Sequence, residues 1–220
     1  MSRDPLVRWI GAQRDVLRGD IAGRVALTDL ASLPHLYALG PLEGVSGEIS
    51  VFDGEAFIAR VVEGRVTVAV NVDARACFLV YASVAGWRGV VVPEPLDDDH
   101  ALDRALRAAA RAHGLAGPPW AFRVRGMSTG IIYHVLDKRD QLPHTPQRHE
   151  EAKARFEADR VAIEAIGFYS ESHRGVFTPA DSDTHVHFRT ADGRQSGHVE
   201  RLRLAPGWVL GLPRDVGSDA

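Results

Sequence analysis

The sequence predicts a mixed α/β (α+β) fold that is rich in strands, with one long helix between two groups of strands. Short apolar runs bounded by turn-forming residues recur along the chain, a pattern typical of β-strands. Residues 98–113 instead carry apolar side chains at helical spacing. The chain has 220 residues, 45% of them hydrophobic, so it can bury a core as one large domain or two small subdomains.

The N-terminal part is predicted to contain a helical extension, residues 1–34, followed by a β-rich half, residues 35–125. The extension is expected to contain a short amphipathic helix over residues 5–18. The long helix follows an acidic run at residues 97–99, which supplies N-caps, and ends before Gly114. Strands are predicted at residues 47–54, 55–62, 65–72, 76–84 and 120–125, with Glu63-Gly64 as a hairpin turn.

The second half is predicted to span residues 126–213, followed by a disordered tail at residues 214–220. Thr145-Pro146 has the residue types of an N-cap and a first helical position, and it predicts a charged surface helix over residues 146–158. Strands are expected at residues 131–136, 162–170, 175–178, 200–204 and 208–212.

The histidines near the end of the chain suggest a chemical function. His185 and His187 are two residues apart, so on a strand both side chains point to one face. Asp192-Gly193 is a strong hairpin-turn dipeptide and would bring His198 beside them on a second strand. Three neutral imidazoles with an open fourth position are a common way to hold a catalytic divalent metal. A cupin reading of the pair is disfavoured, because a cupin glutamate would follow within a few residues and none occurs before Glu200.

Composition excludes several other classes of protein. The net charge is −3 and the chain has only two lysines, so neither a nucleic-acid partner nor a membrane partner is expected. The N-terminus lacks the apolar core of a signal peptide and no apolar run reaches membrane length, which predicts a cytoplasmic protein. The single cysteine, Cys77, lies in an apolar run and is expected to be a packed core thiol rather than a nucleophile.

Two separated segments together resemble the α-acetolactate decarboxylase family. The early segment is Gly47-Glu-Ile-Ser-Val-Phe-Asp-Gly-Glu-Ala-Phe57, and the late one combines Thr184-His-Val-His-Phe188 with Ser196-Gly-His198. The stretch Trp120-Ala-Phe-Arg-Val-Arg-Gly126 is similar to a strand of the same family, and the likeness runs in order over residues 35–204. A second resemblance, to a plant and prokaryote conserved domain, would explain only residues 160–204.

The first resemblance implies a fold, a cofactor and a ligand set. The family fold is an α/β unit of two packed β-rich halves, usually a homodimer. His185, His187 and His198 would hold Zn²⁺ or another divalent metal such as Fe, Mn, Co or Ni, and Glu48 would be the acid/base or the carboxylate facing the metal. The substrate would be a small 2-hydroxy-3-oxo acid, decarboxylated from acetolactate to acetoin while the metal stabilises the enediolate.

Three departures from the family concern substrate recognition. His134 stands where the family has an arginine that binds the substrate carboxylate, and Pro41 stands where it has a threonine. The family glutamate on a C-terminal tail has no counterpart after Glu200. Arg123, Arg125 or Arg174 are candidates to replace the arginine as substrate-binding groups, and His134 is itself a candidate catalytic group.

Three hypotheses about function therefore stay open. The first is a carboxy-lyase of the acetolactate decarboxylase type. The second is an enzyme of the same fold with another reaction, such as an isomerase, a dehydratase or a cyclase in a biosynthetic pathway. The third is a metal-binding or ligand-binding module without catalysis.

Overall fold

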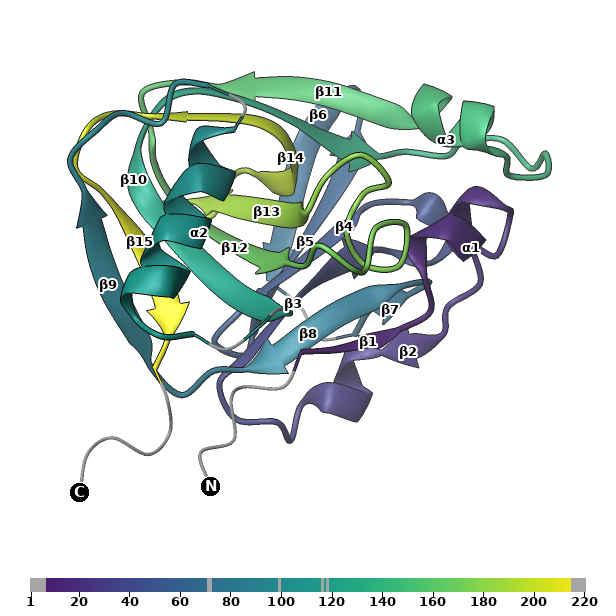
Figure 1. Ribbon diagram of the computed structural model, residues 1–220. Coiled ribbons are helices and arrows are strands. Elements are labelled where there is room, and N and C mark those ends of the chain that lie inside the picture. Colours follow the sequence, from purple (N-terminus) through teal and green to yellow (C-terminus); the bar gives the residue numbers. More distant parts are fainter. Residues whose placement is uncertain (1–6, 71–72, 99, 116, 118, 215–220) are drawn as a thin grey trace.

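The computed structural model in Figure 1 describes residues 7–70, 73–98, 100–115, 117 and 119–214. Its first layer is a six-stranded antiparallel sheet of order β1-β8-β3-β4-β5-β6. The predicted turn at Glu63-Gly64 is confirmed, since both residues adopt positive φ as a two-residue hairpin requires. The strands are β1 Arg8–Ile10, β3 Leu36–Pro41, β4 Glu48–Phe52, β5 Glu55–Val62, β6 Arg65–Val70 and β8 Leu79–Ser83.

The second layer is a seven-stranded sheet built around the long strand β10, Trp120–Leu136. The first half of β10 pairs with β12 and β15, and its second half pairs with β11 and β14. Because β12 continues through β13 and β14 back to β10, these four strands close into a ring. The remaining strands are β9 Trp87–Val92, β11 Lys153–Ala158, β12 Ala162–Tyr169, β13 Thr184–Thr190, β14 Ser196–Leu204 and β15 Trp208–Pro213.

Apolar side chains join the two sheets and attach the main helix. Tyr37 and Phe57 of the first sheet share a buried cluster with Ile166 and Phe168 of the second. Helix α2, Ala101–Ala112, buries its apolar stripe in the core of the seven-stranded sheet, across which it lies in Figure 1. The predicted long helix is thus present between the two groups of strands along the chain, but in space it lies on one sheet. Strands dominate the fold more than the mixed α/β prediction implied.

The prediction of a helical extension at the N-terminus is wrong. Residues 8–10 form strand β1, which pairs with β8, and only Gln13–Leu17 form a helix, α1. Gly11 separates them with a φ of +72°, a conformation that does not occur inside a right-handed helix. The rest of the extension contains the short strand β2, Val25–Ala26, paired with β7, Arg75–Ala76, and a 3₁₀ turn, Leu27–Leu30.

The predicted helix over residues 146–158 is also wrong in its second half. Thr145 caps helix α3, Pro146–Glu151, as expected, but Lys153–Ala158 forms strand β11 along β10. Pairing along the second half of β10 overrides the helical propensity of this charged segment. Residues 175–178 form a turn closed by a bridge between Arg174 and Thr178, not the predicted strand.

The predicted boundary between two halves at residues 125 and 126 falls inside β10, which crosses it without interruption. Strand β9, from the predicted first half, also pairs with β15 of the second. Of the predicted tail, only Arg214 lies among the described residues. Within the described part of the chain, no helix is long and apolar enough to cross a membrane.

Candidate active site

A row of polar side chains crosses four adjacent strands of the second sheet. Arg155 on β11 is the direct partner of His134 on β10, which is the partner of His198 on β14, which is the partner of His187 on β13. Directly opposite residues of antiparallel strands project to the same face about 4.5–5.5 Å apart. The local pairing therefore places one guanidinium and three imidazoles on one surface, with His185 two residues from His187 on the same face.

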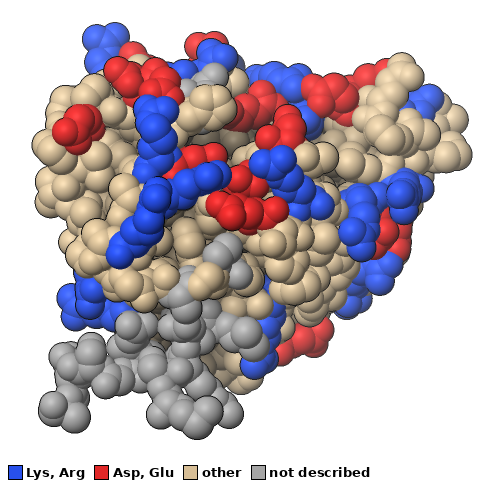
Figure 2. Space-filling view, in the orientation of Figure 1, with Lys and Arg blue, Asp and Glu red and all other residues tan. Residues whose placement is uncertain are grey.

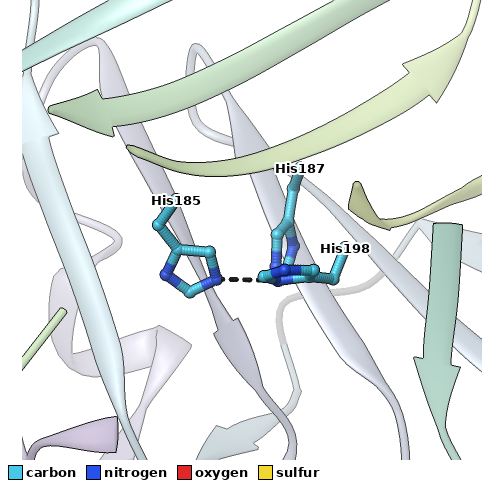
Figure 3. Close-up of side chains that lie close together, drawn as sticks. All are labelled: His185, His187 and His198. Carbon is cyan, nitrogen blue, oxygen red and sulfur yellow. Dashed lines mark hydrogen bonds between the residues drawn. The ribbon is translucent and has the colours of Figure 1, made fainter. Parts of the chain in front are cut away.

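Three histidines converge at the centre of this row. One nitrogen each of His185, His187 and His198 lies within 4.8 Å of the other two (Figure 3). Nδ1 of His185 donates to the carbonyl of Phe177 at 2.8 Å, which leaves Nε2 with its lone pair, 3.0 Å from Nδ1 of His198. Nε2 of His187 is buried without a hydrogen-bond partner.

This geometry fits a divalent metal ion. Burial lowers the pKa of all three imidazoles, to about 4 for His185, so they are neutral at pH 7 as metal ligands must be. A buried lone pair that no protein group satisfies costs free energy unless a ligand uses it. Three histidines with an open position are the donor set of catalytic Zn²⁺ and also suit other first-row metals.

Strand β4 of the first sheet supplies two further groups, Glu48 and Ser50, on the face that meets the histidines. The oxygens of Glu48 lie 3.8 Å from Nε2 of His187 and 3.9 Å from Nε2 of His134. Burial raises the pKa of Glu48 well above its usual range. Oγ of Ser50 lies 3.1 Å from Nδ1 of His187 and accepts a hydrogen bond from Oγ of Ser196. Glu48 thus lies beside the imidazoles, and Ser50 holds one of them.

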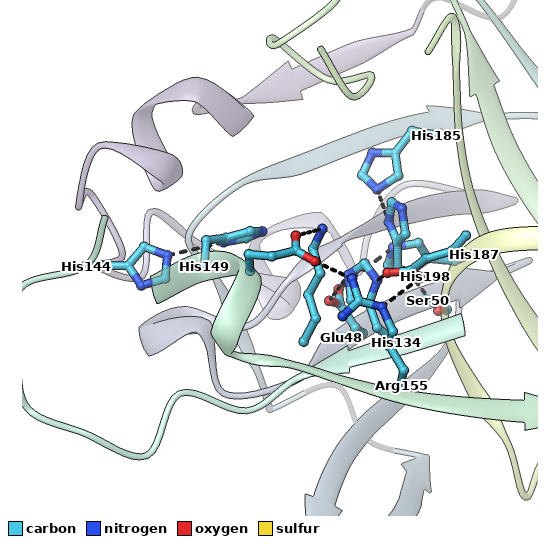
Figure 4. Close-up of polar contacts among 12 residues, drawn as sticks. Glu48, Ser50, His134, His144, His149, Arg155, His185, His187 and His198 are labelled. Carbon is cyan, nitrogen blue, oxygen red and sulfur yellow. Dashed lines mark hydrogen bonds and ion pairs between the residues drawn. The ribbon is translucent and has the colours of Figure 1, made fainter. Parts of the chain in front are cut away.

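His134 is held by a chain of charged groups (Figure 4). Its ring stacks on that of His198 with centroids 4.5 Å apart, and its Nδ1 lies 2.9 Å from Oε1 of Glu200. Nε of Arg155 donates to Oε2 of the same carboxylate at 2.9 Å. Because Glu200 engages Nδ1 of His134, the other ring nitrogen faces Glu48. Burial lowers the pKa of His134, while the hydrogen bond that its ring donates to the Glu200 carboxylate opposes that shift.

Most of these residues, though not the fully buried His187 and Ser50, line one cavity of about 750 Å³. Its wall runs from Glu48 and the histidines to α2 and to the loop before β13, and it carries charged side chains of both signs. Figure 2 shows the same mixture of basic and acidic side chains on one face of the molecule. The cavity has room for a small polar substrate beside the imidazoles.

The sequence profile of the family described as alpha-acetolactate decarboxylase matches residues 17–209, which include every residue of this site. The chain belongs to the alpha-acetolactate decarboxylase family. The match begins well before Glu48, so it extends beyond the segment that the second resemblance would explain. Acetolactate decarboxylases are carboxy-lyases, and the expected membership of this enzyme family is confirmed.

Solved structures support the same fold. The alpha-acetolactate decarboxylase from Bacillus subtilis strain 168 is similar with a TM-score of 0.77 and 16% identity, over 94% of this chain and 85% of that chain. A protein of unknown function from Staphylococcus aureus, described as similar to alpha-acetolactate decarboxylase, gives a TM-score of 0.74 and 13% identity, over 96% and 86%. A search of curated proteins gives no match.

The three arginines that were candidates for substrate binding occupy different places. Arg123 does not line the cavity: its guanidinium lies 3.3 Å from Glu164 and stacks over Trp87. Arg125, the other candidate on that strand, also pairs with Glu164. Arg174 lines the cavity, but its Nε donates to the buried carboxylate of Asp183 at 2.8 Å.

Sequence reasoning missed four residues of the site: Ser50, Lys153, Arg155 and Glu200. Ser50 follows Glu48 by two residues, so strand alternation was a usable signal that both share a face. Lys153 and Arg155 were assigned to a helix. Glu200 enters the sequence analysis only as the first glutamate after the His185 and His187 pair, and no pattern links it to His134.

Proposed function

We propose that the protein is a metal-dependent decarboxylase of a small 2-hydroxy-3-oxo acid, converting acetolactate to acetoin. The observation that supports this proposal is the position of Glu48. Its carboxyl lies within 4 Å of two imidazole nitrogens and lines a cavity beside three histidines that fit a metal ion. Zn²⁺ is the metal we propose, with Fe, Mn, Co or Ni as substitutes. A cytoplasmic location and a homodimer stay predictions.

The reaction needs a sink for negative charge and a source of a proton. When the bond between C2 and the carboxyl carbon breaks, its electron pair moves toward the neighbouring ketone, and C2 must then receive a proton. A divalent metal held by His185, His187 and His198 would act as a Lewis acid that stabilises this charge. Glu48 is the group we assign to the proton transfer, since its buried, raised-pKa carboxyl can hold a proton near neutral pH.

His134 lies beside the Glu48 carboxyl and orients it. Its Nε2 faces Glu48 at 3.9 Å, and the Glu200 carboxylate fixes its ring through Nδ1. The position lies next to His198 across the strand pair, so a substrate between the metal ligands and Glu48 would touch it. We propose that His134 orients the substrate and the Glu48 carboxyl there.

A turnover assay tests the proposal. Purified protein with quantified metal is incubated with racemic 2-acetolactate, and acetoin is followed over time. We expect acetoin formation that EDTA abolishes and that added metal restores. A protein holding one metal per chain but forming no acetoin would contradict the proposal.

A second candidate is another metal-assisted reaction of a hydroxy-keto substrate, such as an isomerisation or a dehydration. The observation that favours it is His134, a group able to transfer protons at a position where the family resemblance places an arginine. His134→Arg separates the two candidates. If acetolactate is the native substrate, the substitution should preserve or improve turnover, because the arginine can orient the substrate by binding its carboxylate in place of the imidazole. It should damage the native activity otherwise.

A further inference from the structure

Strand β11 brings two cations, Lys153 and Arg155, to the wall of the cavity that contains Glu48 and the histidines. Both bind the same carboxylate, that of Glu150 at the end of α3. Nζ of Lys153 lies 2.6 Å from Oε2 of Glu150, and Nη2 of Arg155 donates to Oε1. The two side chains therefore form a two-cation site that already holds a carboxylate supplied by the chain itself.

This site faces the reacting end of the cavity. Arg155 is the cross-strand partner of His134, and Lys153 is the partner of Leu136, which lines the same cavity. In Figure 4 Arg155 lies next to His134, its cross-strand partner.

We propose that Lys153 and Arg155 bind the carboxylate of the substrate, at the position that Glu150 takes in this structure. The inference rests on the proposed function and adds to it the residues that would bind the carboxylate of the hydroxy-keto acid. Neither residue is at the position of the family arginine, which is His134 here.

Glu150 can leave this place at little cost. Its side chain is 55% exposed and belongs to a six-residue helix, so water readily solvates the carboxylate once it is released. Arg107 and Arg174, which also line the cavity, are instead held by Asp183, whose side chain is only 7% exposed. Uncovering Asp183 would leave a buried charge without a partner, which is costly. Lys153 and Arg155 are therefore cations that a substrate carboxylate can reach by exchange with Glu150.

The test compares the binding of two matched probes to zinc-loaded protein by calorimetry. 2-Hydroxyisobutyrate carries the carboxylate and the hydroxyl but has no ketone, and 2-hydroxyisobutyramide is its uncharged counterpart. Lys153→Met should reduce the preference for the anion roughly tenfold to a hundredfold, the usual range for losing a hydrogen bond to a charged group. Lys153→Arg should restore much of it.

The chain offers a matched control and an independent second variant. Lys138 is the only other lysine, it also pairs with a carboxylate, that of Asp140, and it does not line this cavity. Lys138→Met should leave the preference unchanged. Glu150→Gln, at an exposed position, should strengthen binding of the anion and leave binding of the amide unchanged, because it removes the competing charge.

An unchanged preference in Lys153→Met, or an equal loss of both probes at equal zinc content, would overturn the inference. Unchanged anion binding in Glu150→Gln would also contradict it, since displacement of Glu150 would then play no part. Because no turnover is involved, the result is separate from the decarboxylase assay. A protein that prefers the anion to the amide as expected, but forms no acetoin, has the carboxylate-binding site and catalyses another reaction.

Discussion

Replacing Ser50 with alanine should weaken metal binding without unfolding the protein. A metal ion coordinated by Nε2 of His187 requires the proton on Nδ1, and Oγ of Ser50 lies 3.1 Å from that atom. The backbone of Ile49 also forms a hydrogen bond with this ring. Both Ser50 and His187 are fully buried, so water cannot replace the Ser50 hydroxyl. Losing one of the hydrogen bonds of the ring costs about 0.5–1.5 kcal/mol. Loss of a group that orients a metal ligand typically reduces metal affinity roughly tenfold to a hundredfold.

Competition with a chromophoric zinc chelator measures this effect directly. Ser196→Ala, one hydrogen bond further from the metal, should give a smaller loss, since Ser50 can still accept from His187. Ser128→Ala is the matched control, because Ser128 of β10 is equally buried but its Oγ donates to the carbonyl of Ala158 on β11. Zinc affinity of Ser50→Ala equal to that of Ser128→Ala would refute the assignment of Ser50 to the His187 ring.

Three other outcomes follow from burial and close packing. Cys77 has a pKa of about 12 because it is buried, so alkylating reagents should label it at pH 8 only after unfolding; rapid labelling of native protein would contradict this. Gly197→Ala should lower the midpoint of thermal unfolding and weaken zinc binding, because a Cβ there would lie 2.7 Å from the carbonyl oxygen of His134. Burial and the neighbouring His144 hold the pKa of His149 at about 3, below the value in the unfolded chain. The free energy of unfolding therefore decreases as the pH falls from about 6.5 toward 3. In denaturant titrations, His149→Phe should lose less free energy of unfolding between pH 7 and pH 5 than the unsubstituted protein does.

The metal ligands could be predicted because they depend on local sequence. His185, His187 and His198 lie within 14 consecutive residues, and strand alternation plus one turn dipeptide is enough to bring them to one face. The register that pairs His187 with His198 follows from the hairpin alone. Glu48 was proposed only through the family resemblance, because its position facing the triad depends on how two sheets pack, which no local pattern records.

The cation site was missed for the opposite reason. Residues 146–158 are rich in Glu, Ala, Lys and Arg, and their propensity favours a helix throughout. The strand conformation of Lys153–Ala158 comes from pairing with β10, a partner that begins 33 residues earlier in the sequence. The intrinsic helix propensity of the segment contributes less than the pairing of six residues with a neighbouring strand. An error in one secondary structure element thus removed two charged residues from the predicted site.

The cross-strand row couples the charges of neighbouring strands. Residue 134 and residue 155 are direct partners, so a positive charge on either projects to the same face of the sheet. The ring of His134 is held by an anion, since its Nδ1 lies 2.9 Å from Oε1 of Glu200. That carboxylate is itself balanced by Arg155, and Lys153 on the same face neutralises Glu150. The histidine, the acid and the two cations therefore form one connected set of charges, and we expect that changing His134 alone alters the charge available at Arg155 as well.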